Sequence, residues 1–255
     1  MVLALDVSSS VLGFTDTFMK LAVVVPAHNE QNRIGAMLDA YLDFFSQNDV
    51  VVEFIVVLNG CTDDTQRVVQ DRLQRGVLTI IDMPDAGKGL AIKRGFQESL
   101  KTDAQLIGFV DADMATKPYD FYELIKNGTQ DGIIASRYMK ESKLFPPRPA
   151  IKEWGRRLVY QPLVRLLFGM NFKDYQCGAK LFKRTVIERV TPHLSVAQWA
   201  FDVELLYLCK RFGFLIQEFP TVWYDQDDSK LRMKSGFRML GSLFAIRNQH
   251  AKRSL

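Results

Sequence analysis

The most informative stretch of this chain is Leu106-Ile107-Gly108-Phe109-Val110-Asp111-Ala112-Asp113-Met114. The apolar run that opens this segment predicts a buried strand, and Asp111 and Asp113 follow at its carboxyl end. Residues i and i+2 of an extended segment point to one side, so both carboxylates are expected to face the crevice in which open α/β sheets bind ligands. Two hard oxygen ligands suit Mg²⁺ or Mn²⁺ bridging a diphosphate. An acidic loop that caps a helix is the alternative.

Strand-like and helix-like segments alternate through the first half of the chain. Between the second strand and the next helix lies the turn Asn59-Gly60-Cys61-Thr62-Asp63-Asp64, in which Thr62 is the expected N-cap. This order of elements is typical of a doubly wound, mostly parallel sheet flanked by helices, and therefore of an α/β fold. The predicted strands cover 21–26, 51–58, 77–81, 106–110 and 133–136, and the predicted helices cover 30–45 and 88–100.

Two amphipathic helices are expected in the second half. The alternation breaks at Phe145-Pro146-Pro147-Arg148-Pro149, where three prolines predict a loop. Beyond it every fourth residue from 154 to 170 is apolar, and Pro162 is expected to kink that helix. Each helix either lies on a membrane surface or packs its stripe on the sheet. The apolar positions are Trp154, Leu158, Pro162, Leu166 and Met170 in the first helix and Phe237, Leu240 and Phe244 in the second.

The composition is that of a globular protein with a basic C-terminal segment. The 255 residues suffice for one large domain or two small ones, and 47% of them are hydrophobic. The net charge is +4, but residues 230–255 alone hold seven Lys or Arg and no acidic residue. This segment indicates an anionic partner, such as a phosphate or a membrane surface, or else a solvated helix face. Nucleic acid is not expected, because aromatic stacking motifs are not evident.

Three cysteines, Cys61, Cys177 and Cys209, lie far apart in the sequence and form no CxxC pair. They argue against a disulfide framework or a zinc site and for a reducing compartment, and Cys177 is expected to be a packed small residue rather than a nucleophile. Residues 1–20 have no basic n-region and no cleavage site. No uncharged apolar run reaches the ~18–20 residues that span a bilayer. We therefore expect a cytoplasmic protein, either soluble or peripheral on the cytoplasmic face of a membrane.

Motif spacing narrows the class of protein further. Gly87-Lys88-Gly89 lacks the spacing of a P-loop or of GxGxxG, which argues against an NTPase or a dehydrogenase. Other segments resemble, in their order and spacing, the signatures of glycosyltransferase family 2. In the first half these segments are Val24–Glu30, Gly60–Thr65, Gly87–Ala91 and Asp111–Asp113. In the second half Asp174–Phe182, Trp199–Leu206 and Ser229–Leu231 are similar to the dolichyl-phosphate β-glucosyltransferases and other polyprenyl-phosphate glycosyltransferases, so the resemblance runs from about residue 20 to 248.

The resemblance implies a single GT-A-like, Rossmann-like domain over residues 20–255, after an N-terminal extension of residues 1–19. Residues 20–140 would bind the nucleotide sugar, and residues 141–255 would face the acceptor and the membrane. The implied reaction moves glucose from UDP-glucose to a dolichyl or polyprenyl phosphate and inverts the anomeric centre. The alternatives are a GDP-mannose-dependent polyprenyl-phosphate mannosyltransferase, a soluble enzyme of the family with a non-lipid acceptor, and a non-catalytic module that binds sugar nucleotides or membranes.

On the donor side, the resemblance implies that Asp111 and Asp113 hold Mg²⁺ or Mn²⁺ together with the diphosphate and the sugar. Lys88 would neutralise the diphosphate, unless it is a surface lysine. Glu30 would accept hydrogen bonds from the ribose or the base, unless it only adds charge to a helix start. The implied nucleotide-sugar residues are Pro26, Ala27, Asn29, Glu30, Asn59, Asp63, Lys88, Asp111, Ala112 and Asp113.

The chain departs from the family pattern at two places in this site. Many relatives have Asp-Asp-Gly-Ser where this chain has Leu58-Asn59-Gly60-Cys61, so Asn59 or Asp63 would have to replace the usual base-binding aspartate. Ala115 stands where some mannosyl relatives have a third metal ligand. The metal is therefore expected to have fewer protein ligands and more water around it.

On the acceptor side, Arg137 follows a predicted strand and is placed to bind a phosphate bidentately, with a structural salt bridge as the alternative. Lys230 would close over the diphosphate or meet the acceptor phosphate. Asp202 and Glu204 reach a cleft if they start a helix, and otherwise form an N-terminal charge cluster. The implied catalytic residues are Asp111, Asp113, Arg137 and Lys230, and the implied acceptor and sugar residues are Arg137, Asp174, Gln176, Trp199, Asp202, Glu204, Ser229 and Lys230.

Overall fold

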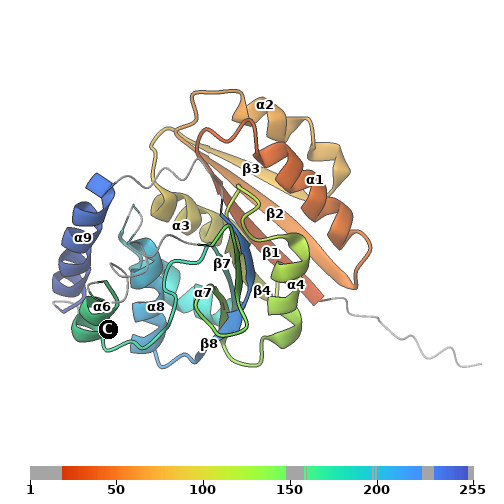
Figure 1. Cartoon of the computed structure of the whole chain (residues 1–255). Coiled ribbons are helices and arrows are strands. Elements are labelled where there is room, and N and C mark those ends of the chain that lie inside the picture. The colour runs from red at the N-terminus through yellow and green to blue at the C-terminus, as the bar shows by residue number, and fades with distance from the viewer. Residues whose placement is uncertain are drawn as a thin grey trace, which may run out of the picture.

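The computed structural model describes residues 19–147, 158, 160–196, 198, 200–225 and 233–251, with side chains in the last range from residue 241 onward. Strands and helices alternate along its first half (Figure 1). In chain order the strands are β1 (Met19–Ala27), β2 (Val50–Asn59), β3 (Leu78–Met83), β4 (Leu106–Val110), β5 (Gly132–Ser136), β6 (Lys143–Phe145), β7 (Ala179–Lys183), β8 (Ile216–Pro220) and β9 (Val222–Tyr224). The α-helices are α1 (Ile34–Phe45), α2 (Thr65–Gln70), α3 (Lys88–Ser99), α4 (Pro118–Asn127), α6 (Gln161–Phe168), α7 (Arg184–Val190), α8 (Phe201–Arg211) and α9 (Met233–Ala251).

Seven strands form the central sheet in the order β3-β2-β1-β4-β7-β5-β8, and β6 pairs with β9 in a separate two-stranded sheet. The first four of these strands are parallel, and the register joins Ala27 to Leu58 and Val24 to Phe109. The carboxyl ends of β1, β2 and β4 therefore lie at one edge. Because central parallel strands are buried on both faces, β1 and β2 consist of near-continuous apolar runs rather than alternating ones. The predicted α/β fold with a mostly parallel sheet is confirmed.

Strand β7 runs antiparallel between β4 and β5, which the sequence pattern did not predict. Its residues Ala179 and Lys180 pair with Val110 and Phe109 at the end of β4. A Cβ atom on Gly108 would lie 2.5 Å from the Lys180 carbonyl oxygen, so only glycine allows the two strands to close here. The insertion brings the segment before β7 next to the carboxyl end of β4.

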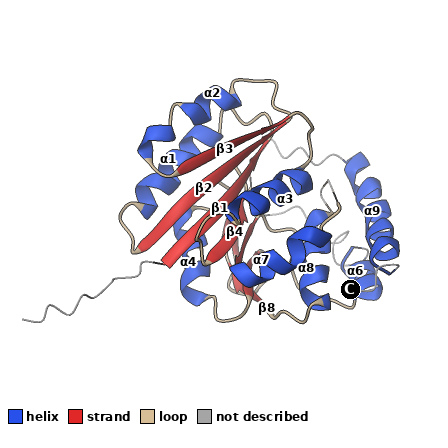
Figure 2. Ribbon diagram, turned by 180° about the vertical axis from the view of Figure 1, so that it is seen from behind, coloured by secondary structure: helices blue, strands red, loops and turns tan. Residues whose placement is uncertain are grey.

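Helices cover both faces of the sheet (Figure 2). On one face, α1 and α4 bury Met37, Tyr41 and Phe121 against the sheet. On the other face, α3 and α8 bury Phe96 and Phe201, and α7 packs there as well. Helices α6 and α9 lie side by side beyond α8 (Figures 1 and 2). The two layers leave the carboxyl edge of β1, β2 and β4 to be lined by loops.

One local expectation is wrong. Thr62 does not cap α2, because the helix begins after Asp64 and the Thr62 hydroxyl contacts the Asn29 side chain instead. Pro162 lies in the first turn of α6, and the kink expected there stays a prediction, because most of the segment before it lies outside the described residues. The remaining predicted strands and helices lie within a few residues of the observed ones, and β4 has the predicted bounds.

The two amphipathic stripes are only partly packed. In the first, Leu158 and Leu166 are exposed while Met170 is buried. In α9 the buried residues are Leu243, Ile246 and His250, and Phe244 of the predicted stripe is half exposed. Trp154 and the side chains of Phe237 and Leu240 lie outside the described residues. Within the described part of the chain, no helix is both long enough and apolar enough to cross a bilayer.

Candidate active site

The carboxyl edge of the sheet is held together by Asn59, the last residue of β2. Its buried amide donates from Nδ2 to the Ala27 carbonyl oxygen (2.6 Å) and accepts at Oδ1 from the Gly87 amide (3.0 Å). It therefore joins the end of β1 to the turn before α3. A carboxylate at this position could not donate to the Ala27 carbonyl, which gives a physical reason for asparagine here. The predicted contact of Asn59 with the nucleotide base stays a prediction.

Two loops, one after β1 and one after β2, lie beside Asn59. Asn29 adopts a positive φ of 54° and accepts from the Thr62 amide at 2.8 Å. Asp63 accepts from the Thr65 amide (3.0 Å) and the Thr65 hydroxyl (2.5 Å). Burial opposes the charged form of Asp63, but these hydrogen bonds outweigh it and lower the pKa of its carboxyl. Glu30 forms an ion pair with Arg33, three residues on. The polar side chains of the two loops thus order each other.

The two predicted metal ligands lie beyond the end of β4, opposite the start of α3. Lys88, the first residue of α3, places Nζ 2.6 Å from Oδ1 of Asp111. Lys88 is therefore not a surface lysine. Asp113 accepts from the Ala115 amide at 3.0 Å, and the next residue, Met114, has a positive φ of 61°. Burial and then the charge of Asp111 raise the pKa of Asp113 to about 6.

These residues suit a divalent cation. Asp111 and Asp113 place two carboxylates beside Lys88, and the charge of Asp111 adds to burial in raising the pKa of Asp113. Within the described residues, no third His, Cys, Asp or Glu joins them in a cluster that could hold a metal. Mg²⁺ is commonly bound by one or two carboxylates with substrate phosphates and water as the other ligands. The donor set therefore fits a metal that arrives with a diphosphate, and Ala115 adds no ligand, as the sequence led us to expect.

Gly178 fixes the place of Asp111. The Asp111 amide donates to the Gly178 carbonyl oxygen at 3.0 Å. A Cβ atom on Gly178 would lie 1.9 Å from Oδ2 of Asp111, closer than any tolerable contact. Any other residue at this position would displace the carboxylate. Nothing local in the sequence around Gly178 signals this role, which depends on the pairing of β7 with β4.

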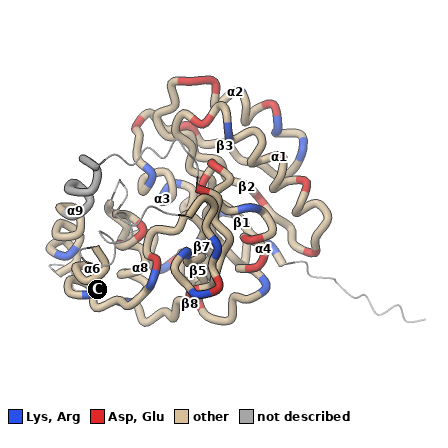
Figure 3. Tube along the Cα trace, viewed as in Figure 1, with Lys and Arg blue, Asp and Glu red and all other residues tan. Residues whose placement is uncertain are grey.

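A second group of charged residues lies around β7 and β5 (Figure 3). Lys180 of β7 is completely buried, and its Nζ donates to the Cys177 carbonyl oxygen (2.7 Å) and to Oδ1 of Asp202 (2.5 Å). The centroid of the Phe109 ring lies close to both lysines, 5.2 Å from Nζ of Lys180 and 5.9 Å from that of Lys88. Burial lowers the pKa of Lys88, but the charges of Asp111 and then Asp202 outweigh it and raise that pKa overall. Asp202 thus lies within electrostatic reach of the Asp111 site.

Lys180 was missed by sequence reasoning, although a lysine within the apolar strand Ala179–Phe182 was a usable signal. The neighbouring Cys177 is fully buried, and burial raises the pKa of its thiol to about 12. The prediction that Cys177 is a packed residue is confirmed.

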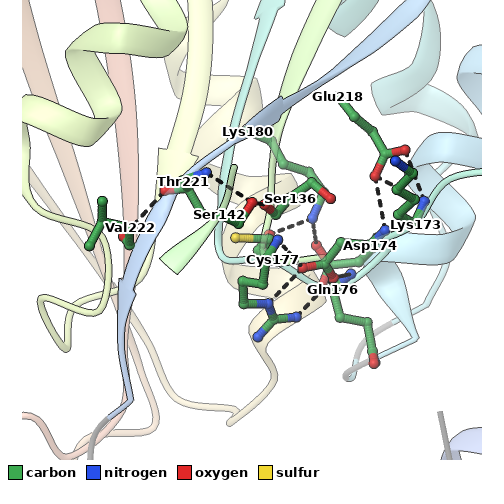
Figure 4. A network of polar contacts seen from close by, with 12 residues as sticks. Ser136, Ser142, Lys173, Asp174, Gln176, Cys177, Lys180, Glu218, Thr221 and Val222 are labelled. Atoms are coloured by element: carbon green, nitrogen blue, oxygen red, sulfur yellow. Dashed lines mark hydrogen bonds and ion pairs between the residues drawn. The ribbon is translucent and has the colours of Figure 1, made fainter. Parts of the chain in front are cut away.

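Arg137 and Asp174 form a closed ion pair. Arg137 donates to Asp174 from its backbone amide (3.0 Å), from Nε (2.6 Å) and from Nη2 (2.9 Å). Burial would raise the pKa of Asp174, but Arg137 outweighs it and holds that pKa at about 2. The Gln176 amide donates to the same carboxylate, and Glu218 accepts from the amides of Lys173 and Asp174 (Figure 4). Of the two roles expected for Arg137, its contacts show the structural salt bridge. Its predicted role in binding a phosphate stays a prediction.

The remaining acceptor-side residues fall into two groups. Glu204 is fully buried and turned away from Asp202, with its carboxylate bonded to Ser195, Val196 and His250. The structure therefore gives Glu204 contacts within the protein only. Trp199, Ser229 and Lys230 lie outside the described residues, so their predicted roles stay predictions.

On the donor side, Pro26, Ala27 and Ala112 are buried at the strand ends, as their place in the motifs requires.

Comparison with known proteins agrees with this geometry. The family model described as glycosyl transferase family 2 matches residues 22–191. A dolichyl-phosphate beta-glucosyltransferase of Dictyostelium discoideum is 32% identical over 249 residues, which cover 89% of this chain and 73% of that protein. The human protein of the same name is 33% identical, over 83% of this chain and 69% of its own length. The Saccharomyces cerevisiae protein of that name is 30% identical, over 89% and 74%.

Solved structures share the fold. Glucosyl-3-phosphoglycerate synthase from Mycobacterium tuberculosis, crystallised with Mn²⁺, UDP and glucosyl-3-phosphoglycerate, matches with a TM-score of 0.65 and 20% identity, over 89% of this chain and 78% of that one. The same enzyme crystallised with Mg²⁺ and UDP matches with a TM-score of 0.64. At this level of identity the match concerns the fold, which is the GT-A arrangement that the motifs predicted. With the family model and the relatives in agreement, the chain belongs to glycosyl transferase family 2 and is a glycosyltransferase.

Proposed function

We propose that this chain transfers glucose from UDP-glucose to dolichyl phosphate or another polyprenyl phosphate and inverts the anomeric centre. The observation that carries the proposal is the group formed by Asp111, Asp113 and Lys88 at the carboxyl edge of the sheet. It occurs in a chain whose relatives, matched over more than 80% of its length, are dolichyl-phosphate beta-glucosyltransferases. A UDP-glucose donor and a dolichyl phosphate acceptor fit this family.

On the donor side, Asp111 and Asp113 would hold Mg²⁺ or Mn²⁺. The bound cation would offset the charge of the departing UDP. Lys88 would exchange its contact with Asp111 for an oxygen of the diphosphate, which offers the ammonium group another negative partner. The loops that carry Asn29, Glu30 and Asp63 would line the nucleoside pocket, and residues 20–140 would form the donor half of the domain.

On the acceptor side, residues 141–255 would supply the lipid-phosphate site. A phosphate monoester is anionic near neutral pH, so it needs orientation and relief of charge repulsion rather than a strong general base. Lys230 would supply positive charge. Asp202, held by Lys180, would border the sugar. Arg137, through Asp174 and Gln176, would order the loop before β7.

A membrane surface is the proposed location of the acceptor half. Three large apolar side chains face solvent: Leu158 just before α6, Leu166 within α6 and Phe244 on α9. The basic residues of the C-terminal segment would add attraction to anionic lipids, at about 1 kcal/mol for each well-placed charge. The cysteines found free in the structure fit a reducing compartment, so the proposed side is the cytoplasmic face. Flotation with anionic liposomes at low salt, reversed at high salt, is expected; no flotation at low salt would favour a soluble acceptor.

The reaction is tested with radiolabelled sugar nucleotides, polyprenyl phosphate and Mn²⁺. We expect label from UDP-glucose in a lipid-extractable, acid-labile product. Label from GDP-mannose instead would make the chain a mannosyltransferase, and label only in a water-soluble product would point to a non-lipid acceptor. No product from any common UDP- or GDP-sugar would overturn the acceptor assignment. Thermal shifts with UDP and GDP, each with and without Mn²⁺, test the donor base independently of the acceptor.

A further inference from the structure

The carboxylate of Glu204 makes an unusually complete set of hydrogen bonds for a residue without a contact at the donor site. Oε2 accepts from the amides of Ser195 (3.0 Å) and Val196 (2.8 Å). Oε1 accepts from the Ser195 hydroxyl (2.5 Å) and from Nε2 of His250 (2.7 Å). Burial would raise the pKa of Glu204, but the bonds from His250 and Ser195 outweigh it and lower that pKa. An ionised carboxylate on α8 is thus held inside the protein by two other segments, residues 195–196 and the last turn of α9.

His250 connects this carboxylate to the last turn of α9. Its ring is fully buried and faces the Tyr207 ring of α8 edge-on, at 6.1 Å between centroids. Nη1 of Arg211 donates to the His250 carbonyl oxygen (2.5 Å). Within the described residues, Nδ1 of His250 has no hydrogen-bond partner. Burying a histidine and a carboxylate is costly compared with an apolar pair of the same size, so a purpose beyond packing is expected for them.

The segment that Glu204 holds leads directly to the donor side. Residues 194–196 and 198, which precede α8, contact α3 and the turn before it at two points. Nε2 of Gln198 donates to the Ala86 carbonyl oxygen (3.3 Å), one residue before Gly87. Nζ of Lys93 donates to the Leu194 carbonyl oxygen (2.5 Å). Glu204 therefore fixes one end of a segment whose other contacts reach Ala86, before α3, and Lys93, in the second turn of that helix. Lys88, which meets Asp111, lies between these two points in the sequence.

We propose that Glu204 and His250 form a latch that holds residues 194–196 and 198 against the turn 86–88, and that they are positioning residues for binding of the donor diphosphate. Lys88 is the group through which the latch acts, so the inference rests on the proposed donor site. It gives Glu204 an indirect role in place of the substrate contact that its motif implied. His250 had no assigned role before.

Two variants break the latch, and a third serves as a matched control. His250→Phe keeps a ring of similar size but removes the donor to Glu204. Glu204→Gln leaves one oxygen where the carboxylate has two, so it cannot accept at once from the Ser195 and Val196 amides and from His250. Tyr207→Phe removes the hydrogen bond from Arg247 to the Tyr207 hydroxyl (2.9 Å), which also joins α8 to α9 but does not reach the loop. All three change the same helix pair, and only the first two change the loop.

Hydrogen exchange of the backbone amides and the kinetics with the donor measure the effect of each variant. In both latch variants we expect amides in peptides 194–198 and 84–90 to exchange at least about 5-fold faster. We expect the KM for the donor to rise about 5- to 10-fold, the loss expected for one loosened charged contact, with kcat within about 2-fold. Tyr207→Phe should change neither. His250→Gln, whose amide can still donate to Glu204, should restore the KM to near the wild-type value.

The outcomes separate the latch from the proposed function. If His250→Phe lowers the Tm but leaves exchange at 84–90 and the donor KM unchanged, the pair is only structural and the inference falls. It also falls if Tyr207→Phe gives the same changes as His250→Phe. If no nucleotide sugar proves to be a donor, while exchange at 84–90 still rises in the latch variants alone, the proposed function fails and the latch stands. If His250→Phe does not fold, His250→Gln and Glu204→Gln carry the same comparison.

Discussion

Two ion pairs of equal length behave differently in this molecule. The shortest contact is 2.6 Å both in Lys88–Asp111 and in Arg137–Asp174. The side chains of Lys88 and Asp111 keep 14% and 26% of their surface exposed, whereas those of Arg137 and Asp174 keep 10% and 2%. The first pair lies at the open edge of the parallel strands, and the second is enclosed between β5 and the segment before β7. Bond length alone therefore does not separate a pair that a ligand can exchange from one that holds the fold.

The neighbours of each pair explain the difference. Asp111 shares its lysine with a second carboxylate, Asp113, whose pKa is raised to about 6, first by burial and then by the charge of Asp111. Asp174 receives three hydrogen bonds from Arg137, and its pKa falls to about 2. One pair has negative charge left over for a cation, and the other has none. Four predictions test this contrast.

The largest effect is expected from Asp113→Ala. Removing this carboxylate should reduce turnover about 10³-fold, because the charge that develops on the leaving diphosphate loses its fixed counter-charge. Product formation and calorimetric binding of UDP with and without Mn²⁺ measure it, and the Tm should change little. Asp49→Ala, in the exposed turn before β2, is the control and should leave both unchanged. Wild-type activity that persists undiminished in excess EDTA would contradict the role of the pair.

Substitutions of Arg137 and of Lys88 should separate an effect on protein stability from an effect on nucleotide binding. Arg137→Met leaves Asp174 buried and unpaired, which should lower the free energy of unfolding by about 3 kcal/mol. Lys88→Met leaves Asp111 able to regain water, so it should cost less than about 1 kcal/mol of stability. Its main effect should be about a 10-fold weaker affinity for UDP with Mn²⁺. Urea unfolding and calorimetry distinguish the two, and equal losses of stability would remove the contrast between the pairs.

A smaller loss is expected from Gly178→Ala. The added Cβ would collide with Oδ2 of Asp111, so the carboxylate should turn away from the place where it meets Lys88. We expect about a 10-fold loss of metal-dependent UDP affinity, the value of one charged contact. Gly241→Ala is the matched control, because a Cβ there meets nothing within 4 Å. If Gly178→Ala binds UDP as tightly as the wild type, the position of Asp111 does not matter for the donor.

The last effect concerns the wild-type protein and appears only in acid, as a dependence of stability on pH. The pKa of Asp174 is depressed in the folded state, to about 2 from an ordinary value near 3.9. Its contribution is therefore complete above about pH 5 and is lost as the pH falls toward 2, by about 2 kcal/mol in all. Urea unfolding of the wild type and Asp174→Asn across this range measures it. The difference between the two proteins should shrink on acidification, and a constant difference would contradict the assignment.

The sequence alone predicts the parts of this molecule that depend on local pattern. Strand β4 has the predicted bounds because its apolar run is long enough to be buried on both faces. Asp111 and Asp113 lie at the predicted sheet edge because they follow that strand directly. The insertion of β7, the pair Lys180–Asp202 and the pair Glu204–His250 could not be predicted this way. The two pairs join residues that are 22 and 46 positions apart, and β7 pairs with a strand still further away in the sequence. Tertiary packing rather than periodicity decides which of these residues meet.

The place of β7 also sets the order in which the molecule is completed during synthesis. β5 leaves the ribosome more than forty residues before β7, yet it cannot take its final place in the sheet until β7 has formed, because β7 lies between β4 and β5. Until residue 183 is available, β4 has one unpaired edge, and an apolar edge of this kind readily pairs with strands of other chains. Asp111 acquires its contact with Gly178 only when that gap closes. A nascent chain is thus most exposed to aggregation just before its catalytic edge is assembled.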